Sequence, residues 1–292
     1  IRYKEWHVDR LEALGSWSAS SGELALKKIR VSSPKVERLS AVHGASGGLV
    51  EAGPVTLNFK EMREFSVPVH FEEAHIHWMV APAVAKIFPL DFRLSGDVDA
   101  RVNLPKSGPW KVEAKLKLAA TDFVLDNLKL KVRKKRSEIV AVKRVDLVGA
   151  VQIDPDGVRP NGLSVILPNS KFEVSGLVGF KTGLDLKTTG PVELRDIGHL
   201  MESEIRGKGL LQTHIHGPFS VIICDFDFEL TDAYYLNLDL GQVKGRVTLD
   251  DTSDLVTLRQ LHGSRDRSRY VADGKIIIKD PSRIQLKVDI LE

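Results

Sequence analysis

Alternation of apolar and polar residues recurs through most of this chain of 292 residues. A period of two places every second side chain on the same face of a β-strand. Short connections between such runs cannot make parallel crossovers, so antiparallel hairpins are the simplest consequence. The alternating runs are residues 97–104, 111–118, 128–133, 224–230, 236–240, 243–250 and 284–290.

Turn-forming residues separate many of these runs. Glycine and proline supply the backbone angles that tight turns require. A turn after most runs predicts a meander of hairpins, and a meander of this length favours a continuous trough over a Greek key. The predicted turns include residues 105–109, 154–157, 160–162, 181–183 and 217–218.

Helical patterns are few. Residues 194–204 (LRDIGHLMESE) space their apolar side chains as an amphipathic helix does, and glycines follow them. Residues 3–14 and 81–87 are further candidates for short helices. We therefore expect a mostly β fold, a long curved antiparallel sheet shaped like a taco or groove, with a few short helices.

The apolar faces of these strands must be hidden from water. They can pack on a second sheet, close into a barrel, or line a groove that an apolar ligand fills. Alternation alone does not choose among the three, and a sandwich is the usual outcome in ordinary proteins. Mostly aliphatic side chains at the apolar positions, with an aromatic content of 7%, favour the groove.

Composition excludes several classes of protein. Lys plus Arg total 42 and Asp plus Glu 39, a net charge of +3 that is too small for a dedicated nucleic-acid-binding domain. The single cysteine, Cys224, leaves no disulfide framework and no cysteine-based zinc site. Neither a signal peptide nor a run of about 18 apolar residues is visible. Because the chain starts at Ile1, we expect it to be a piece of a longer protein.

Residues 173–251 carry a more particular pattern. The predicted short helix is followed by a Gly-x-Gly-x-Leu phrase at 207–211, by Gly-Pro at 217–218, and by an element that closes with Gly-Gln-Val-Lys-Gly at 241–245. A weaker echo lies in residues 94–118. This arrangement resembles the AsmA-like proteins of Gram-negative bacteria, and the TamB group in particular.

The resemblance implies a transport function and no catalytic site. It implies a taco-shaped sheet with an apolar interior, anchored at the inner membrane in the full-length protein, that spans the periplasm and conducts phospholipids to the outer membrane. The implied partners are phospholipids or other acyl-chain lipids, the bacterial envelope membranes and an outer-membrane β-barrel protein. The family offers no catalytic motif to carry over, and we expect no enzyme activity, no cofactor and no nucleic-acid partner.

On this hypothesis one face of each strand lines the lipid path. Acyl chains that lie against aliphatic side chains leave water, at about 0.8 kcal/mol per buried CH₂. Cys224 alternates with Phe226, so we expect a buried, inert thiol that would serve as a labelling handle in a groove. The predicted lining residues are Val98, Val102, Val112, Leu116, Leu118, Phe226, Phe228, Leu230, Leu238, Val247 and Leu249.

The strongest cluster of charge is basic and lies between residues 129 and 144. It is interpreted either as a contact for lipid phosphates and anionic membrane surfaces, or as the solvent-facing side of a hairpin. Little aromatic interleaving accompanies it, which argues against base stacking. The residues proposed for contact with lipid headgroups are Lys129, Lys131, Arg133, Lys134, Lys135 and Arg136.

Two His-x-His pairs place imidazoles on one face of a strand. They are His75 with His77 and His214 with His216. This spacing can bind a metal when a third ligand is near. Solvated strand histidines are the simpler interpretation, so the sequence predicts no metal site. The candidates for a third ligand are Glu72, Glu73 and Asp225.

Catalytic patterns are also lacking in the sequence. Asp225, Asp227 and Glu229 place three carboxylates on one strand face, but no loop of calcium ligands accompanies them, so a charged exterior is expected. The serines between residues 18 and 21 lack the Gly-x-Ser-x-Gly phrase of a nucleophile elbow. The sequence therefore predicts that the protein is not an enzyme.

Two other functions remain open at this point. The chain could be a β-sandwich adhesion or binding module, which predicts two facing sheets and no co-purifying lipid. It could also be a scaffold for assembly of outer-membrane proteins, offering a sheet edge for strand addition. We treat residues 1–292 as one β-groove segment with sub-units 1–95 and 96–292 as an alternative. Alternation does not fix which face is concave, since a one-residue slip inverts every side chain.

Overall fold

The structure is a computed structural model of the 292-residue chain. It describes residues 2–3, 6–7, 10–32, 48–58, 64–75, 90–126, 138–197, 205–235, 238–250, 255–277 and 284–291. Two compact units make up the chain. The first unit holds Ile1–Val124 and Lys143–Pro155, and the second holds Leu125–Val142 and Asp156–Glu292. These boundaries lie further along the chain than residue 95.

Strands dominate the described residues. Strands β3–β19 belong to one antiparallel sheet of 17 strands that is not closed, and this confirms the predicted mostly β fold. Strands β1 (Arg2–Tyr3) and β2 (Trp6–His7) pair only with each other. A sandwich requires two facing sheets, and the described part of the chain contains no second sheet larger than this two-stranded one.

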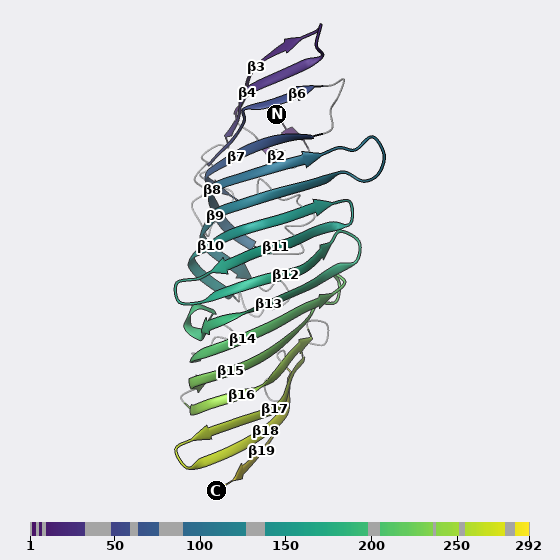
Figure 1. Cartoon of the computed structure of the whole chain (residues 1–292). Coiled ribbons are helices and arrows are strands. Elements are labelled where there is room, and N and C mark those ends of the chain that lie inside the picture. The colour runs from purple at the N-terminus through teal and green to yellow at the C-terminus, as the bar shows by residue number, and fades with distance from the viewer. Residues whose placement is uncertain are drawn as a thin grey trace. The chain divides into compact units, whose positions relative to one another are not determined.

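In the first unit, consecutive strands are mostly neighbours in the sheet (Figure 1). Its strands are β3 (Arg10–Ser18), β4 (Glu23–Ser32), β5 (Leu49–Ala52), β6 (Val55–Asn58), β7 (Glu64–His75), β8 (Leu90–Asn103) and most of β9 (Lys111–Asp126). The short strands β5 and β6 both pair with β4, and β7 pairs with β5 and β8. Strand β10 (Glu138–Asp154) contributes residues to both units.

The second unit is a simple meander. Each strand from β12 to β18 pairs with the strand before it and the strand after it, as the green to yellow ribbons of Figure 1 show. Its strands are β11 (Gly157–Ile166), β12 (Lys171–Gly179), β13 (Gly183–Glu193), β14 (Ile205–Gly217), β15 (Ile223–Tyr235), β16 (Leu238–Asp250), β17 (Leu255–Arg265), β18 (Ser268–Ile277) and β19 (Ile284–Leu291).

The helix predictions fare less well than the strand predictions. The helix expected over residues 3–14 is wrong, because β1, β2 and β3 occupy this segment. Of residues 194–204, Leu194–Ile197 form a 3₁₀-helix, η1, and the remainder lie outside the described residues. The helix predicted over residues 81–87 also lies outside them.

Most predicted turns join strands, with one exception. Residues 154–157 connect β10 to β11, residues 181–183 connect β12 to β13, and 217–218 lie at the start of the β14–β15 loop. The turn predicted at 160–162 is wrong, because β11 continues through it. A register shift between Val158 and Leu163 accommodates these residues as an irregularity within the strand.

Irregular pairing bends the strands of the second unit. Register shifts interrupt each pairing from β14–β15 to β17–β18. Gly207, Asp232 and Gln260 lie at these shifts with φ values of 145°, 51° and 50°. A bulge bends its strand and increases the local twist. Bulges that recur on neighbouring strands therefore curve the sheet, as a groove requires.

One cross-strand contact shows how closely the sheet of the second unit is packed. Gly263 on β17 lies directly opposite Tyr270 on β18. A Cβ atom at Gly263 would lie 1.9 Å from Cζ of the Tyr270 ring. The Tyr270 hydroxyl donates a hydrogen bond of 2.8 Å to the carbonyl oxygen of Leu240. The missing side chain at 263 thus leaves room for a ring that ties β18 to β16.

We expect Gly263→Ala to lower the free energy of unfolding by about 1–3 kcal/mol, because the new methyl group overlaps the Tyr270 ring. In a Tyr270→Ala background the overlap is absent, so the same change should cost little. Chemical denaturation of the two single variants and the double variant measures this coupling. Equal costs in both backgrounds would show that the ring does not occupy this space.

Candidate functional site

The register of the second unit brings five predicted lining residues to one face of the sheet. Directly opposed residues of antiparallel strands point to the same side. Phe226 on β15 lies opposite Val247 on β16. Phe228 and Leu230 follow Phe226 at alternate positions of β15, and Leu249 follows Val247 on β16. We call this side the apolar face of the second unit.

Opposed pairs carry the apolar face across the neighbouring strands. At its paired positions from β12 to β19 there is no Asp, Glu, Lys or Arg among the described residues. The face is therefore continuous and uncharged over the width of this part of the sheet. One row of opposed residues, from β13 to β18, consists of Leu186, Ile215, Cys224, Leu249, Val256 and Ile276.

Side chains of the apolar face are shielded but leave accessible surface. Leu211, Leu230 and Val243 are at most 8% exposed, whereas no large side chain among the described residues falls below 2%. Exposure rises on β19, where Val288 is 46% and Ile290 71% exposed. This gradient differs from the dry core of two packed sheets, in which large side chains are fully buried.

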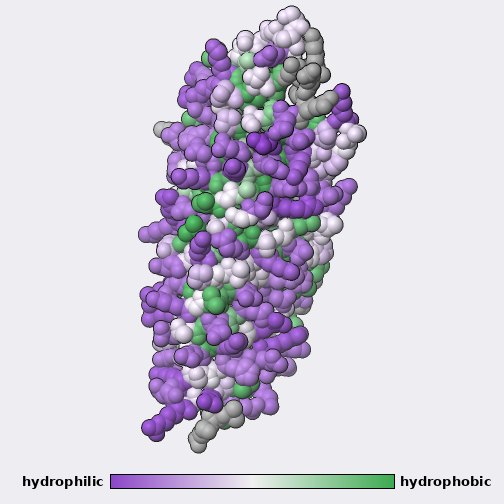
Figure 2. Space-filling view, in the orientation of Figure 1, coloured by the Kyte–Doolittle hydropathy of each residue, from purple (hydrophilic) through white to green (hydrophobic). Residues whose placement is uncertain are grey.

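The opposite side, the polar face of the second unit, carries paired charges. Arg246 donates hydrogen bonds of 2.7 and 3.0 Å to the Asp227 carboxylate, and Lys244 Nζ lies 3.2 Å from Glu229. Both pairs are directly opposed in the register of β15 and β16. Hydrophilic side chains dominate the view in Figure 2, with smaller hydrophobic patches between them. Asp227 and Glu229 of the predicted carboxylate row thus lie on an exterior stabilised by ion pairs.

Leu238 lies apart from the five predicted lining residues of the apolar face, at the end of β16, although its pairing places it on the same side of the sheet, because its partner Tyr235 lies opposite Ile205. It pairs with Tyr235 at the end of β16, beyond two register shifts between β15 and β16. Its exposed fraction is 62%. The alternation that predicts its face is interrupted by the irregularity at Gly241, whose φ is 68°.

In the first unit, Val98 and Val102 share one face of β8. They lie opposite Val69 and Phe65 of β7. Val112, Leu116 and Leu118 occupy alternate positions of β9, so these three share a face of that strand. Val98 and Leu116 both line a cavity of about 600 Å³. Its lining residues with acidic, basic or imidazole side chains are Lys27, Lys28, Glu51, His70, Asp97, Asp99, Lys115 and Lys117.

A ladder of cross-strand ion pairs and hydrogen bonds forms part of the wall of this cavity. Lys28 Nζ is 2.8 Å from Glu51 Oε1, and Arg30 Nε donates to the same oxygen at 2.6 Å. Hydrogen bonds from Lys28 and Arg30 hold the pKa of the Glu51 carboxyl below its ordinary value. Glu51 lies opposite His70, whose Nδ1 is 2.7 Å from Asp97 Oδ1. The ladder therefore crosses four neighbouring strands, β4, β5, β7 and β8.

The basic residues predicted to contact lipid headgroups, Lys129 to Arg136, lie outside the described residues. Two further members of the basic tract are described. Lys143 is exposed, and Arg144 pairs with Asp146 two residues along the same strand at 2.8 Å. Headgroup contact by the tract stays a prediction.

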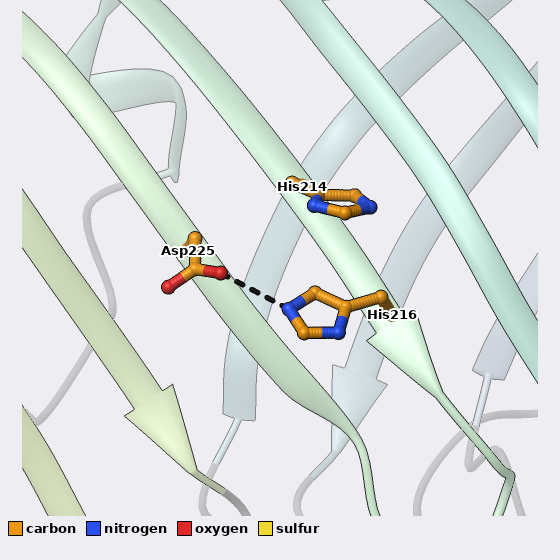
Figure 3. A group of neighbouring side chains, drawn as sticks. All are labelled: His214, His216 and Asp225. Carbon is orange, nitrogen blue, oxygen red and sulfur yellow. Dashed lines mark hydrogen bonds and ion pairs between the residues drawn. The ribbon is translucent and has the colours of Figure 1, made fainter.

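The second His-x-His pair lies beside a carboxylate (Figure 3). His216 Nε2 is 3.0 Å from Asp225 Oδ2, and His214 lies directly opposite Asp225 in the register. The rings of His214 and His216 stack with centroids 4.4 Å apart. One ligand-type atom from each of the three residues falls within 4.8 Å of the others. All three side chains are half-buried.

Two further side chains orient this group. Thr248 donates a hydrogen bond of 2.6 Å to Asp225 Oδ1, and His214 Nε2 lies 2.8 Å from Asp185 Oδ1. The hydrogen bond from Thr248, followed by that from His216, lowers the pKa of the Asp225 carboxyl. The hydrogen bond from His214 likewise lowers the pKa of Asp185. Both carboxylates are thereby held in their charged form next to the imidazoles.

The first His-x-His pair is only partly described. His75 lies opposite Arg93 at the end of β7, and His77 is outside the described residues. Within the described part of the chain, the ligand-type side chains that gather closely enough for a metal are those around His214.

The comparisons with known proteins give no relative for this chain. Neither a scan of protein-family models nor searches of curated proteins and of solved structures finds a match. No helix among the described residues is long and apolar enough to cross a membrane. The apolar face, the cavity and the histidine cluster are therefore interpreted from their own geometry, without a relative as a guide.

Several residues of the apolar face are missing from the sequence-based set. Leu186 and Ile215 belong to the row that contains Cys224, and Leu211 lies opposite Phe228. Period-two alternation of Leu184, Leu186 and Thr188 could have indicated β13, and that of Leu211, Thr213 and Ile215 could have indicated β14. On these two strands Thr188 and Thr213 stand at apolar-face positions, and His214 and His216 stand at polar-face positions. The difference in polarity between alternate residues is therefore smaller than on β15, and the pattern is harder to recognise.

Acidification should test the Glu51 ladder. Because the folded-state pKa of Glu51 is lowered, its contribution to stability is present above the unfolded value, near 4.5, and is lost as pH falls through the folded value. We expect the unfolding free energy of Glu51→Gln to depend less on pH below 4.5 than that of the unchanged chain. Denaturation midpoints measured from neutral to acidic pH give both curves.

A variant that lacks the two cations separates the effect of the Glu51 ion pairs from a general effect of the Glu51→Gln substitution on stability. When Lys28→Met and Arg30→Met remove both cations, Glu51→Gln should no longer alter the pH dependence. Parallel curves for the unchanged chain and Glu51→Gln would contradict the ladder.

Proposed function

We propose that the apolar faces of the two units bind the acyl chains of lipids, each unit acting as a segment of a lipid-conducting groove. The single observation that carries this proposal is the absence of charge from the paired positions of the apolar face between β12 and β19, in the described residues. An acyl chain laid on this face leaves water at about 0.8 kcal/mol per CH₂.

The similar aliphatic composition along the apolar face suits movement of an acyl chain as well as its binding. The rows consist mainly of Leu, Ile, Val and Gly, so successive positions offer an acyl chain similar contact energies. A lipid can then shift along the sheet without a deep minimum that traps it. The ion pairs of the polar face keep the other side of the sheet hydrated. No reacting group is required, and the protein acts as a passive conduit.

The first unit supports the same proposal through opposed aliphatic positions. Val98 and Val102 on β8 lie opposite Val69 and Phe65 on β7, and Val67 lies opposite Ala100 between them. By alternation these side chains lie on the face opposite His70, Asp97 and Asp99. The first unit therefore also separates an aliphatic face from a charged face on these two strands.

The resemblance to AsmA-like proteins supplies the cellular setting of the proposal. In that setting the chain is part of an inner-membrane-anchored protein of the bacterial envelope, works in the periplasm, and delivers phospholipids toward the outer membrane with an outer-membrane β-barrel protein as partner. The match of fold, a long antiparallel sheet that is not closed, supports this assignment.

Labelling Cys224 tests the proposal directly. Cys224 is the only cysteine and is half-buried on the apolar face, opposite Ile215 and Leu249. We expect a polarity-sensitive dye at Cys224 to shift to shorter wavelength, saturably, on titration with a lysophospholipid. Phe228→Asp should weaken that binding by about tenfold or more, because the carboxylate must lose water beneath the acyl chain.

The control places the same dye on the other side of the sheet. Leu210 is 58% exposed and lies opposite Glu229 on the polar face. The Cys224→Ser, Leu210→Cys variant should show no saturable shift, and Leu210→Asp should leave lipid affinity unchanged. Equal responses from both dye positions, or no response at Cys224, would refute the groove.

A further inference from the structure

A cluster of two histidines and an aspartate lies on the polar face, away from the proposed lipid-binding side. His214, His216 and Asp225 project from β14 and β15 on the side opposite Cys224 and Phe226. From these residues we infer a binding site for a divalent transition-metal ion of the Zn²⁺ class. The inference is independent of the proposed function, since no residue of the apolar face contributes to it.

The ligand-type atoms of the three residues lie near the spacing that a shared metal ion requires. In tetrahedral coordination with a metal–ligand distance of about 2.05 Å, ligand atoms lie about 3.4 Å apart. His216 Nε2 and Asp225 Oδ2 are 3.0 Å apart, and the three ligand-type atoms lie within 4.8 Å of one another. Small rotations of the side chains would bring all three to a common ion. A neutral His216 would then carry its proton on Nδ1, which leaves Nε2 free to bind the ion.

The backbone holds the cluster in place. His214 and His216 are separated by one residue on β14, so both imidazoles leave the same face of one strand. The hairpin register sets Asp225 directly across from His214. A metal would therefore bind to a preformed strand pair rather than order a loop, which reduces the entropy lost on binding.

Outer hydrogen bonds complete the arrangement usual for metal ligands. Asp185 is bonded to Nε2 of His214, which leaves Nδ1 of that ring for the ion. Thr248 donates to Oδ1 of Asp225, which leaves Oδ2 on the side of His216. Metal-bound histidines commonly donate their second nitrogen to a carboxylate in this way.

The donor set selects the class of ion. Two imidazole nitrogens and one carboxylate oxygen suit Zn²⁺, Ni²⁺, Co²⁺ or Cu²⁺, whereas Ca²⁺ and Mg²⁺ require oxygen ligands. Asp185 and Asp225 together carry two negative charges, which balance a divalent cation. With side-chain exposures of 33% for His216 and 30% for Asp225, water can supply the remaining coordination positions.

The test uses the untagged full chain, freed of metal with EDTA. Titration with Zn²⁺ against a chromophoric chelator should give one ion per chain, and Co²⁺ should produce the absorption bands of a coordinated ion. His216→Gln and Asp225→Asn should each lower Zn²⁺ affinity by at least about tenfold. Asp185→Asn should lower it by about 10–100-fold through loss of the outer hydrogen bond.

The matched control is His70→Gln. His70 also lies 2.7 Å from an aspartate on the neighbouring strand, Asp97, but no second imidazole stands beside it in the described residues. This variant should bind Zn²⁺ as the unchanged chain does. Far-UV circular dichroism in EDTA checks that each variant is folded.

A measurement on the unchanged chain covers the case in which a variant fails to fold. Zn²⁺ should protect His214 and His216, but not His70, from diethyl pyrocarbonate, as read by mass spectrometry. Absence of Zn²⁺ uptake at neutral pH, equal uptake by a folded His216→Gln variant, or equal loss in His70→Gln would overturn the proposal.

Discussion

The structure depends on one constraint, which is that opposed residues of antiparallel strands share a face of the sheet. Because Phe226 lies opposite Val247 and Asp227 opposite Arg246, a single register separates aliphatic from charged side chains across the hairpin. Repeated from strand to strand, the same register makes one uncharged face and one ionic face. Among the described residues no second sheet larger than the β1–β2 pair is present, so curvature of the sheet and bound ligand are two ways to shield the uncharged face.

The two faces can therefore do different work. Bulges at residues such as Asp232 and Gln260 bend the strands, and glycine at 263 admits the Tyr270 ring, so the backbone accommodates a curved apolar surface. The polar face meets water through ion pairs that are each worth little alone, since exposed pairs contribute about 0–1 kcal/mol. On that face, the same cross-strand geometry brings imidazoles to a carboxylate. The proposed lipid contact and the proposed metal site thus lie on opposite sides of the sheet of the second unit and can be tested separately.

Sequence reasoning reaches the strands but not all of their pairing. Alternation in residues 224–230 reveals both faces of β15 directly. Residues 3–14 mislead because Trp6, Leu11 and Leu14 also match helical spacing, and the pairing of β3 with β4 decides the outcome. The approach of His216 to Asp225 depends on the register of the β14–β15 hairpin, which the loop sequence does not specify. Bulges likewise change which positions of a strand point to the apolar face, as at the end of β16, where the pairing shifts between Leu230 and Tyr234.

Native mass spectrometry of the purified chain, followed by organic extraction, tests the central claim that the apolar face holds acyl chains. The account predicts adducts with the masses of phospholipids and their recovery in the extract. It also predicts that Leu249→Asp, on the apolar face, removes the adducts, whereas Thr248→Asp, on the polar face, retains them. A chain that carries no lipid when isolated from membrane-containing cells, and that takes up none from vesicles, would contradict the account.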